Sequence, residues 1–201
     1  KGAPKVAGTA KAHGAPLGAD EIQATREAIG WDAEPFVMPE AIQQAWDHRE
    51  QGSQTEAEWD GVFAAYAQAY PELAAEFKRR MQGDLPADFA GRFQAFLDET
   101  IQKTETVATR KASQFAIQAL QEILPEMLGG SADLTGSNFT DWKGAVAVRP
   151  GKDTPAGRHI NYGVREFGMA GVMNGLALHG GYLPFGGTFL TFSDYSRNAI
   201  R

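Results

Sequence analysis

A run of 27 residues, 167–193, contains no Asp, Glu, Lys or Arg, and it limits the possible folds of this chain more than any other feature. A membrane-spanning helix needs about 20 consecutive, predominantly apolar residues. This run is too broken for that, because seven glycines, Asn174, His179 and Pro184 interrupt it. A helix and a strand buried inside an α/β protein account better for so long an uncharged stretch. The sequence therefore predicts an α/β core here and no membrane segment.

Helical spacing of apolar residues dominates the first 123 residues. Asp20 and Thr109 are predicted helix N-caps, Ser53–Glu56 has the pattern of a capping box, and Gly30 is predicted to end a helix. The predicted helices cover residues 21–29, 39–51, 53–70, 71–81, 89–97 and 110–123, after a predicted loop over residues 1–18.

Short apolar runs replace the helical spacing after Ile123. The predicted strands cover residues 127–129, 160–164, 182–185 and 188–190, and the predicted helices cover residues 165–179 and the residues from 192 onward, with a loop over residues 134–157. Fourteen of the 23 glycines lie between residues 129 and 187. This part of the chain therefore needs tight turns or close backbone approach.

The composition excludes several classes of function. The chain has 19 Lys and Arg against 25 Asp and Glu, a net charge of -6, so the basic surface of a nucleic-acid-binding protein is not expected. It has no cysteine, which excludes disulfides, thiolate zinc sites and cysteine nucleophiles and fits an intracellular protein. No pair of histidines has metal-ligand spacing, so we expect no metal site built from this chain alone.

Glu166 stands immediately before the uncharged run and is the most informative single residue. A carboxylate in the first turn of a helix is an ordinary feature, because the helix dipole favours it. A carboxyl group buried in apolar surroundings, however, is easier to protonate and can then donate a hydrogen bond near neutral pH. Arg165, its neighbour, would partly oppose that effect. Glu166 is therefore a candidate functional residue.

Three further patterns have both a structural and a functional interpretation. The glycine-rich turn 129–134 follows a predicted strand, where α/β sheets bind ligands, although a simple turn has the same sequence features. His13 lies on a loop of small residues, which leaves its side chain free to face a ligand. Phe189, Phe192 and Tyr195 recur at three-residue steps, either as core residues or as an aromatic face for a planar ligand.

Several motifs occur in the order seen in transketolases, and the chain resembles that family over essentially its whole length. The motifs are His13–Gly18, Arg110–Ser113, Gly130–Leu134 with Ser137–Asn138, Tyr162–Met169, Leu178–Gly181, and Thr188–Phe192 with Tyr195, Arg197 and Asn198. The resemblance implies an α/β fold of the parallel-sheet, thiamine-diphosphate-binding type, incomplete here and preceded by a mostly helical connecting segment.

The resemblance also implies an activity. Transketolases transfer a two-carbon ketol unit from a ketose phosphate to an aldose phosphate in the pentose phosphate pathway. They use thiamine diphosphate with Mg or Ca, and the ligands of the cation are expected outside this chain. The implied partners are sugar phosphates and a second subunit that completes the active site of a homodimer, in the cytoplasm. Neither nucleic acid nor a membrane is expected as a partner.

The cofactor contacts implied by the resemblance centre on Glu166. This residue is similar to the glutamate that hydrogen-bonds the aminopyrimidine ring, so that the ring can take the proton from the thiazolium and leave a carbanion that attacks the ketose. Phe189, Phe192 and Tyr195 match the pocket around the pyrimidine. Asp133 matches a carboxylate that lines the cofactor site.

The substrate contacts implied by the resemblance involve three residues. His13 matches a histidine near both the cofactor diphosphate and the reacting end of the substrate, and is a catalytic candidate with Glu166. Arg110 and Ser137 match residues that hold the sugar phosphate. Arginine suits this task because its planar guanidinium can donate two parallel hydrogen bonds to a phosphate.

The family pattern is incomplete in this chain. Asn161 stands where many relatives have His, Thr135–Gly136 replaces a commoner Ala-Pro pair, and the Gly-Asp-Gly…Asn motif for the cation is absent. We therefore expect an internal piece of a longer enzyme that is inactive alone. The implied limits are residues 1–86 for the end of the diphosphate-binding domain, 87–105 for a connecting segment and 106–201 for the first part of the pyrimidine-binding domain.

Other functions stay open at this point. Dihydroxyacetone synthase and deoxyxylulose-phosphate synthase share the architecture, and a non-catalytic module of the same fold would keep many of the motifs. The segment His13–Gly18 and Arg110 favour transketolase among these alternatives.

Overall fold

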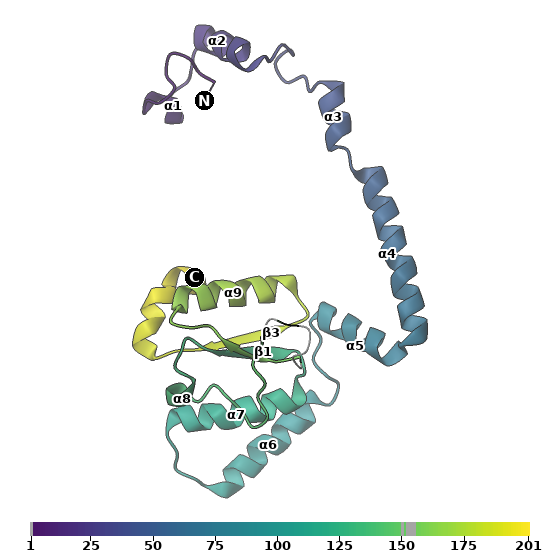
Figure 1. Cartoon of the computed structure of the whole chain (residues 1–201), viewed down its shortest axis with the longest axis vertical. Coiled ribbons are helices and arrows are strands. Elements are labelled where there is room, and N and C mark those ends of the chain that lie inside the picture. The colour runs from purple at the N-terminus through teal and green to yellow at the C-terminus, as the bar shows by residue number, and fades with distance from the viewer. Residues whose placement is uncertain (1, 150, 152–155) are drawn as a thin grey trace. The chain divides into compact units, whose positions relative to one another are not determined.

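The computed structural model describes residues 2–149, 151 and 156–201 (Figure 1). The chain divides into two compact units, one up to Val62 and one from Phe63 onward, and each is considered by itself. The first unit contains α1 (Lys11–Gly14), α2 (Ala19–Ile29), α3 (Glu40–Trp46) and the beginning of α4 (Arg49–Ala69). The short helix α1 corrects the expectation of an uninterrupted loop over residues 1–18.

The ends of two helices in the first unit differ from the prediction. Asp20 lies inside the first turn of α2, so it is not the N-cap, but Gly30 ends this helix in the left-handed conformation, as predicted. The predicted capping box at Ser53–Glu56 is wrong, because these residues lie inside α4. Asp47 serves the start of α4 instead, since its carboxylate accepts hydrogen bonds from the backbone and guanidinium of Arg49 at 3.2 and 2.8 Å.

The second unit contains the sheet. Its helices are α5 (Pro71–Gln82), α6 (Phe89–Lys103), α7 (Thr109–Ile123), α8 (Thr135–Asn138), α9 (Glu166–His179), the 3-10 helix η1 (Leu190–Ser196) and α10 (Arg197–Ile200). Its strands are β1 (Met127–Ser131), β2 (His159–Asn161) and β3 (Leu183–Gly187). Thr109 is the first residue of α7 rather than its cap, and α8 interrupts the predicted loop over residues 134–157. The predicted strand 188–190 is wrong, because the chain enters η1 there.

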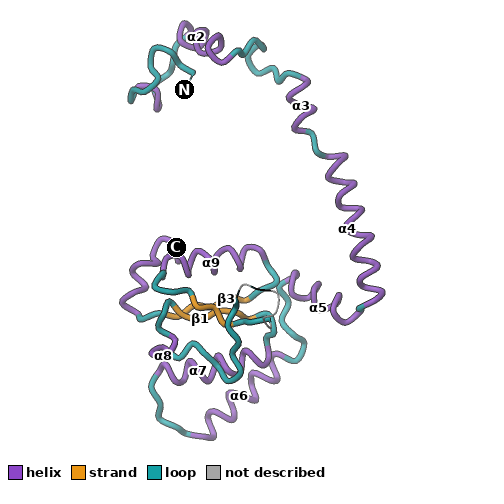
Figure 2. Tube along the Cα trace, in the orientation of Figure 1, coloured by secondary structure: helices purple, strands orange, loops and turns teal. Residues whose placement is uncertain are grey.

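The three strands form a parallel sheet in the order β2-β1-β3, which confirms the predicted α/β class (Figure 2). The central strand contains Gly129 and Gly130, and both sites require glycine. A Cβ atom on Gly129 would overlap the carbonyl oxygen of Phe185, and one on Gly130 would overlap that of Ile160. These close approaches explain two of the glycines that cluster after residue 128.

Helices cover both faces of the sheet (Figure 1). Ala132, Tyr162 and Met169 form a core between α9 and the strands. A second core, on the side of α6 and α7, contains Ile123, Leu124 and Met127, with Phe89, Phe93, Leu120 and Phe185 packed against it. The resulting layers are helix, sheet and helix, the usual arrangement around a parallel sheet.

The uncharged run forms α9, β3 and most of η1, but it is only partly buried. Met169 and Ala170 face the core, whereas the opposite side of α9 exposes Phe167, Val172 and Leu178. The prediction that this helix is buried therefore holds for one face within this chain. In the part of the chain that the structure describes, no helix is long and apolar enough to cross a membrane.

Candidate functional site

A cavity of about 680 Å³ lies against β3 and the segment that follows its carboxyl end, the edge where parallel sheets bind ligands. Its walls come from the start of α7, from α8 and from the segment that follows β3. Its polar lining consists of Thr109, Arg110, Ser113, Ser137, Asn138, Thr140 and Thr188, and its apolar lining includes Ile117, Met127, Phe185 and Phe189. Arg110, Ser137 and Phe189, which are far apart in sequence, are thus brought together.

Arg110 lines this cavity from the first turn of α7. Its guanidinium carbon is 5.3 Å from the centre of the Phe139 ring, and Nζ of Lys111 is 5.7 Å from the same ring. The first turn of α7 contains no acidic residue. Two cations at the positive end of a helix dipole are unfavourable for the helix itself. This arrangement suits the binding of an anion.

Glu166 is the first residue of α9 and is only 8% exposed. The hydroxyl of Thr188 donates a hydrogen bond to Oε1 of Glu166 at 3.3 Å. Thr188 also lines the cavity. The buried carboxylate is therefore held at the cavity wall by a residue from the end of β3.

An aromatic row continues from the cavity along η1. The rings of Phe189 and Phe192 stack with centroids 5.7 Å apart and an interplanar angle of 19°, and Tyr195 follows 6.1 Å beyond Phe192. Phe189 and Tyr195 are exposed, Tyr195 at 68%. The row thus exposes its two end rings to solvent, whereas Phe192 is half-buried. A planar ring placed on it would remove apolar area from water.

Ser131, the last residue of β1, connects the segments around the cavity. Its hydroxyl donates to the carbonyl of Gly187 at 3.0 Å and accepts hydrogen bonds from Leu134 N–H at 3.0 Å and Asn138 Nδ2 at 2.8 Å. Asn138 in turn accepts a hydrogen bond from Thr140 at 3.1 Å. These bonds join the end of β1 to the end of β3 and to α8.

Two of the predicted site residues lie elsewhere. Asp133 is exposed on the turn after β1, with a left-handed backbone (φ 63°), and is not among the residues that line the cavity. His13 is exposed on α1 of the first unit. The assignment of both to the cofactor site stays a prediction.

Sequence reasoning missed three residues of this site: Ser131, Asn138 as a polar link, and Thr188. Ser131 and Asn138 stand in motifs that were recognised, but nothing in the sequence indicates that their side chains meet. For Thr188 a signal existed, because it begins the recognised motif Thr188–Phe192 and comes shortly after the predicted strand 182–185. Its wrong assignment to a further strand concealed that position.

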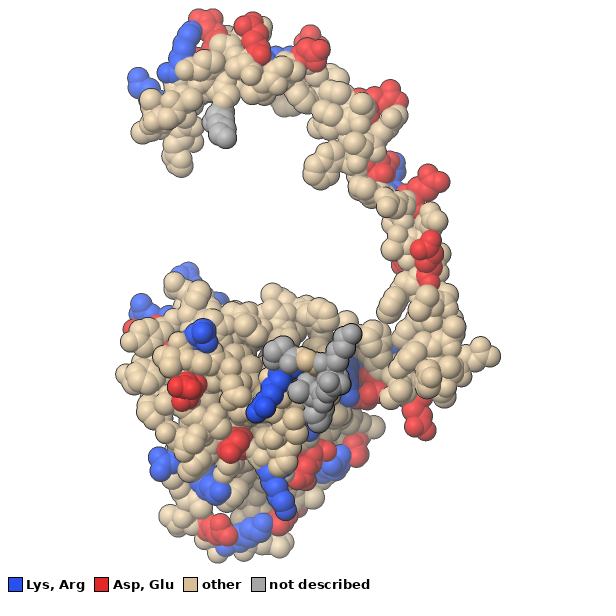
Figure 3. Space-filling model, in the orientation of Figure 1, with Lys and Arg blue, Asp and Glu red and all other residues tan. Residues whose placement is uncertain are grey.

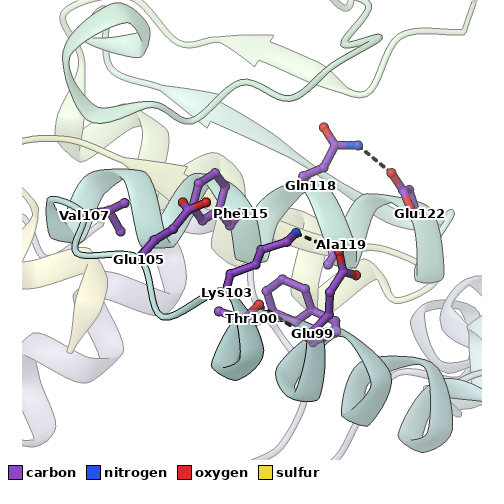
Figure 4. A pocket seen from close by; sticks show the side chains of 11 residues that line it. Glu99, Thr100, Lys103, Glu105, Val107, Phe115, Gln118, Ala119 and Glu122 are labelled. Carbon is purple, nitrogen blue, oxygen red and sulfur yellow. Dashed lines mark hydrogen bonds and ion pairs between the residues drawn. The ribbon is translucent and has the colours of Figure 1, made fainter.

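A second cavity, of about 580 Å³, lies between α6 and α7 (Figure 4). Lys103 extends into it and pairs with Glu99 at 2.7 Å, while Phe96 and Phe115 supply apolar surface. It contains none of the predicted site residues. Among the described residues, no group of three or more His, Asp or Glu could hold a metal ion.

The charged side chains are mixed on the face of the second unit seen in Figure 3, where Lys and Arg are interspersed with Asp and Glu.

Comparison with known proteins decides between the families that share this fold. Residues 1–86 match the sequence model of the transketolase thiamine diphosphate binding domain, and residues 105–201 match that of the transketolase pyrimidine binding domain. The chain belongs to the transketolase family. It is 57% identical to a plasmid-encoded transketolase of Cupriavidus necator over 201 residues and 50% identical to transketolase 1 of Escherichia coli over 200 residues.

Solved transketolases have the same fold. The transketolase of Pichia stipitis in complex with sedoheptulose 7-phosphate matches 94% of this chain with a TM-score of 0.79 and 38% identity. That of Leishmania mexicana matches 94% with a TM-score of 0.77 and 33% identity. The chain covers 28% of each of these structures and spans about 30% of the length of the curated relatives.

Proposed function

We propose that this chain is a segment of a transketolase that transfers a two-carbon ketol unit from a ketose phosphate to an aldose phosphate with thiamine diphosphate. One observation carries the proposal. A single cavity at the carboxyl end of β3 is lined by Arg110 and Ser137. It is also lined by Thr188, which is hydrogen-bonded to the buried carboxylate of Glu166.

The residues of this chain fit the pyrimidine part of the cofactor. Glu166 is buried and fixed by Thr188, so its carboxyl group is oriented before a ring arrives. The row of Phe189, Phe192 and Tyr195 offers apolar ring surface that is partly exposed and otherwise unfavourable in water. The carboxyl group of Glu166 would form a hydrogen bond with a nitrogen of the aminopyrimidine ring, and the aromatic row would orient the plane of that ring.

Thiamine diphosphate supplies, when bound, the electron sink for breaking the carbon–carbon bond beside a ketose carbonyl. The contribution of this chain is to bind and orient the cofactor and the sugar phosphate and to exclude water from them. Arg110 and Ser137 would hold the phosphate end of the sugar, which fixes the distance from that end to the reacting carbonyl. Positioning of this kind can supply a large part of a rate enhancement.

The remaining assignments rest on similarity alone. His13 would lie near the cofactor diphosphate and the reacting end of the sugar, and Asp133 would line the cofactor site. Mg or Ca would be bound by ligands outside this chain. A homodimer in the cytoplasm, acting in the pentose phosphate pathway, fits the family. The domain limits at residues 86 and 106 belong to the same proposal.

The test uses the full-length protein that contains this chain. With thiamine diphosphate and Mg or Ca, it is expected to transfer a ketol unit from xylulose 5-phosphate to ribose 5-phosphate. The isolated 201-residue chain is expected to bind the cofactor weakly or not at all and to be inactive. Absence of transfer to ribose 5-phosphate by the full-length protein, with transfer to another acceptor, would contradict the proposal in favour of a related synthase.

A further inference from the structure

The hydroxyl group of Ser131 has every hydrogen-bonding position occupied. A serine hydroxyl can donate one hydrogen bond and accept two. Ser131 donates to Gly187 O and accepts from Leu134 N–H and Asn138 Nδ2, at 2.8 to 3.0 Å. The residue is 1% exposed, so water cannot replace any of these partners. Such a fully satisfied, buried polar group fixes the relative positions of the segments that it joins.

The two segments joined by Ser131 both line the cavity. Asn138 directly follows Ser137 in α8, on the side proposed to hold the sugar phosphate. Gly187 directly precedes Thr188, whose hydroxyl contacts Glu166 on the side proposed to hold the cofactor. One buried hydroxyl therefore lies between the two subsites, a single residue away from a functional side chain of each.

Each link has a different amount of additional support. The carbonyl of Gly187 also accepts a hydrogen bond from Ala132 N–H at 3.0 Å, so β3 keeps one tie to β1 without the serine hydroxyl. Asn138 has its Oδ1 occupied by Thr140, but its Nδ2 donates to Ser131. The position of α8 therefore depends more on Ser131 than the end of β3 does.

We propose that Ser131 is a positioning residue that sets the spacing between the sugar-phosphate subsite and the pyrimidine subsite. The proposal rests on the proposed transketolase function. Ser131 contacts neither ligand; it acts through Asn138 on the segment that carries Ser137 and through Gly187 on the segment that carries Thr188.

The test compares variants of the full-length protein. Ser131→Ala removes the common partner of all three groups, so it is expected to raise both the Kd of thiamine diphosphate and the KM of the sugar-phosphate acceptor. The expected rise in KM is about tenfold, the effect of losing one buried hydrogen bond. The rise in Kd should be smaller, because Ala132 N–H still holds Gly187. The Kd is measured by calorimetry, without turnover.

A second variant separates positioning from general damage. Asn138→Ala removes the link from Ser131 to α8, together with the bond that Thr140 donates to Asn138, and leaves the bond from Ser131 to Gly187 in place. It is therefore expected to raise the KM of the sugar phosphate and leave the Kd of thiamine diphosphate within twofold of the wild type. Ser53→Ala, at an exposed position of α4, is the matched control and should change neither constant. If Ser131→Ala does not fold, the result with Asn138→Ala decides.

The outcomes distinguish this proposal from the function on which it rests. A wild-type protein that binds both ligands, with unchanged constants in Ser131→Ala, would overturn the positioning role alone. Equal effects of Asn138→Ala on both ligands would also overturn it, because the two links would then not be separate. A wild-type protein that binds neither ligand would overturn the proposed function and the positioning role together.

Discussion

The guanidinium of Arg79 on α5 donates two hydrogen bonds, of 2.9 and 3.0 Å, to the two carboxylate oxygens of Glu126, which is only 4% exposed. Glu126 directly precedes β1, so this pair anchors α5 to the start of the central strand. Arg79 also pairs with Glu76 and donates to the carbonyl of Asp84. Arg79 therefore connects α5, the loop after it and the residue before β1, the strand that leads to the candidate site.

Replacing Arg79 is expected to destabilise the second unit strongly. Arg79→Ala would leave the carboxylate of Glu126 buried without its cation, which typically costs about 3–5 kcal/mol. Arg80→Ala is the matched control, because Arg80 pairs with the more exposed Glu76 and with no other carboxylate of the described residues, and a loss below about 1 kcal/mol is expected. Denaturant unfolding measures both. Equal losses for the two variants would show that the bond to Glu126 has no special weight.

The same arginine makes stability depend on acid pH. Arg79, by hydrogen bonding, lowers the pKa of Glu76 from 4.5 to about 2. A lowered pKa means that the folded state binds fewer protons, so the stabilisation is complete above about pH 4.5 and is lost as the pH falls towards 2. Glu76→Gln should be less stable at neutral pH and show a weaker dependence in this window. An unchanged slope between pH 4.5 and 2 would contradict this assignment.

His159 should add a second dependence at higher pH. It is buried against Trp142, its Nε2 has no hydrogen-bond partner among the described residues, and burial lowers the pKa of its imidazole below the usual 6.5. Protonation therefore favours unfolding, and stability should fall as the pH drops below about 6.5. His159→Leu should flatten this part of the profile, whereas His48→Leu, at an exposed site, should not.

Removal of the carboxylate at position 166 should affect chemistry more than folding. In the full-length enzyme, Glu166→Gln is expected to lower kcat by at least about 100-fold, the usual contribution of a proton-transfer group. Thr188→Val should lower activity about tenfold by releasing the carboxylate, and Thr188→Ser, which keeps the hydroxyl, should remain near the wild type. Steady-state kinetics separate the three variants. A Glu166→Gln enzyme with normal kcat would contradict the assignment.

Replacement of Arg110 should weaken the binding of phosphorylated sugars specifically. Arg110→Ala is expected to raise the KM of ribose 5-phosphate by at least about tenfold, because a charge-assisted hydrogen bond contributes about 1.5–3 kcal/mol. Arg110→Lys should be intermediate, since lysine keeps the charge but not the planar fork. Use of glycolaldehyde, an acceptor without phosphate, should be nearly unchanged. An equal loss with both acceptors would show a structural role instead.

The sequence predicted the long elements better than their ends. The start of α5 at Pro71 and the end of α9 at Gly180 were predicted correctly, because the backbone chemistry of proline and glycine starts or stops a helix locally. The prediction of a capping box at Ser53 was wrong, because the same pattern also fits the interior of a long helix. The hydrogen bond from Arg49 N–H to Asp47 lies at the observed start of α4 instead. At Thr188–Leu190 the apolar pattern predicted a strand, but β1 offers register partners to β3 only as far as Gly187.

The candidate site could be predicted as a set of residues but not as a geometry. The resemblance identified Arg110, Ser137 and Phe189, and the fold brings them to one cavity. The role of Ser131 has no local signal, because it depends on a hydrogen bond to a residue 56 positions away. Tertiary pairing of this kind is decided by strand register, which single-sequence patterns do not specify.

The pairing of β1 with β3 also sets an order of events during protein synthesis. The sheet edge that forms the cavity joins residues separated by 56 positions, and the loop between them must close before any contact compensates its entropy. A growing chain in which β1, α8 and β2 have already left the ribosome therefore still lacks the segment that orients Glu166. Only after residues 183–190 have left the ribosome can this half of the site acquire its shape.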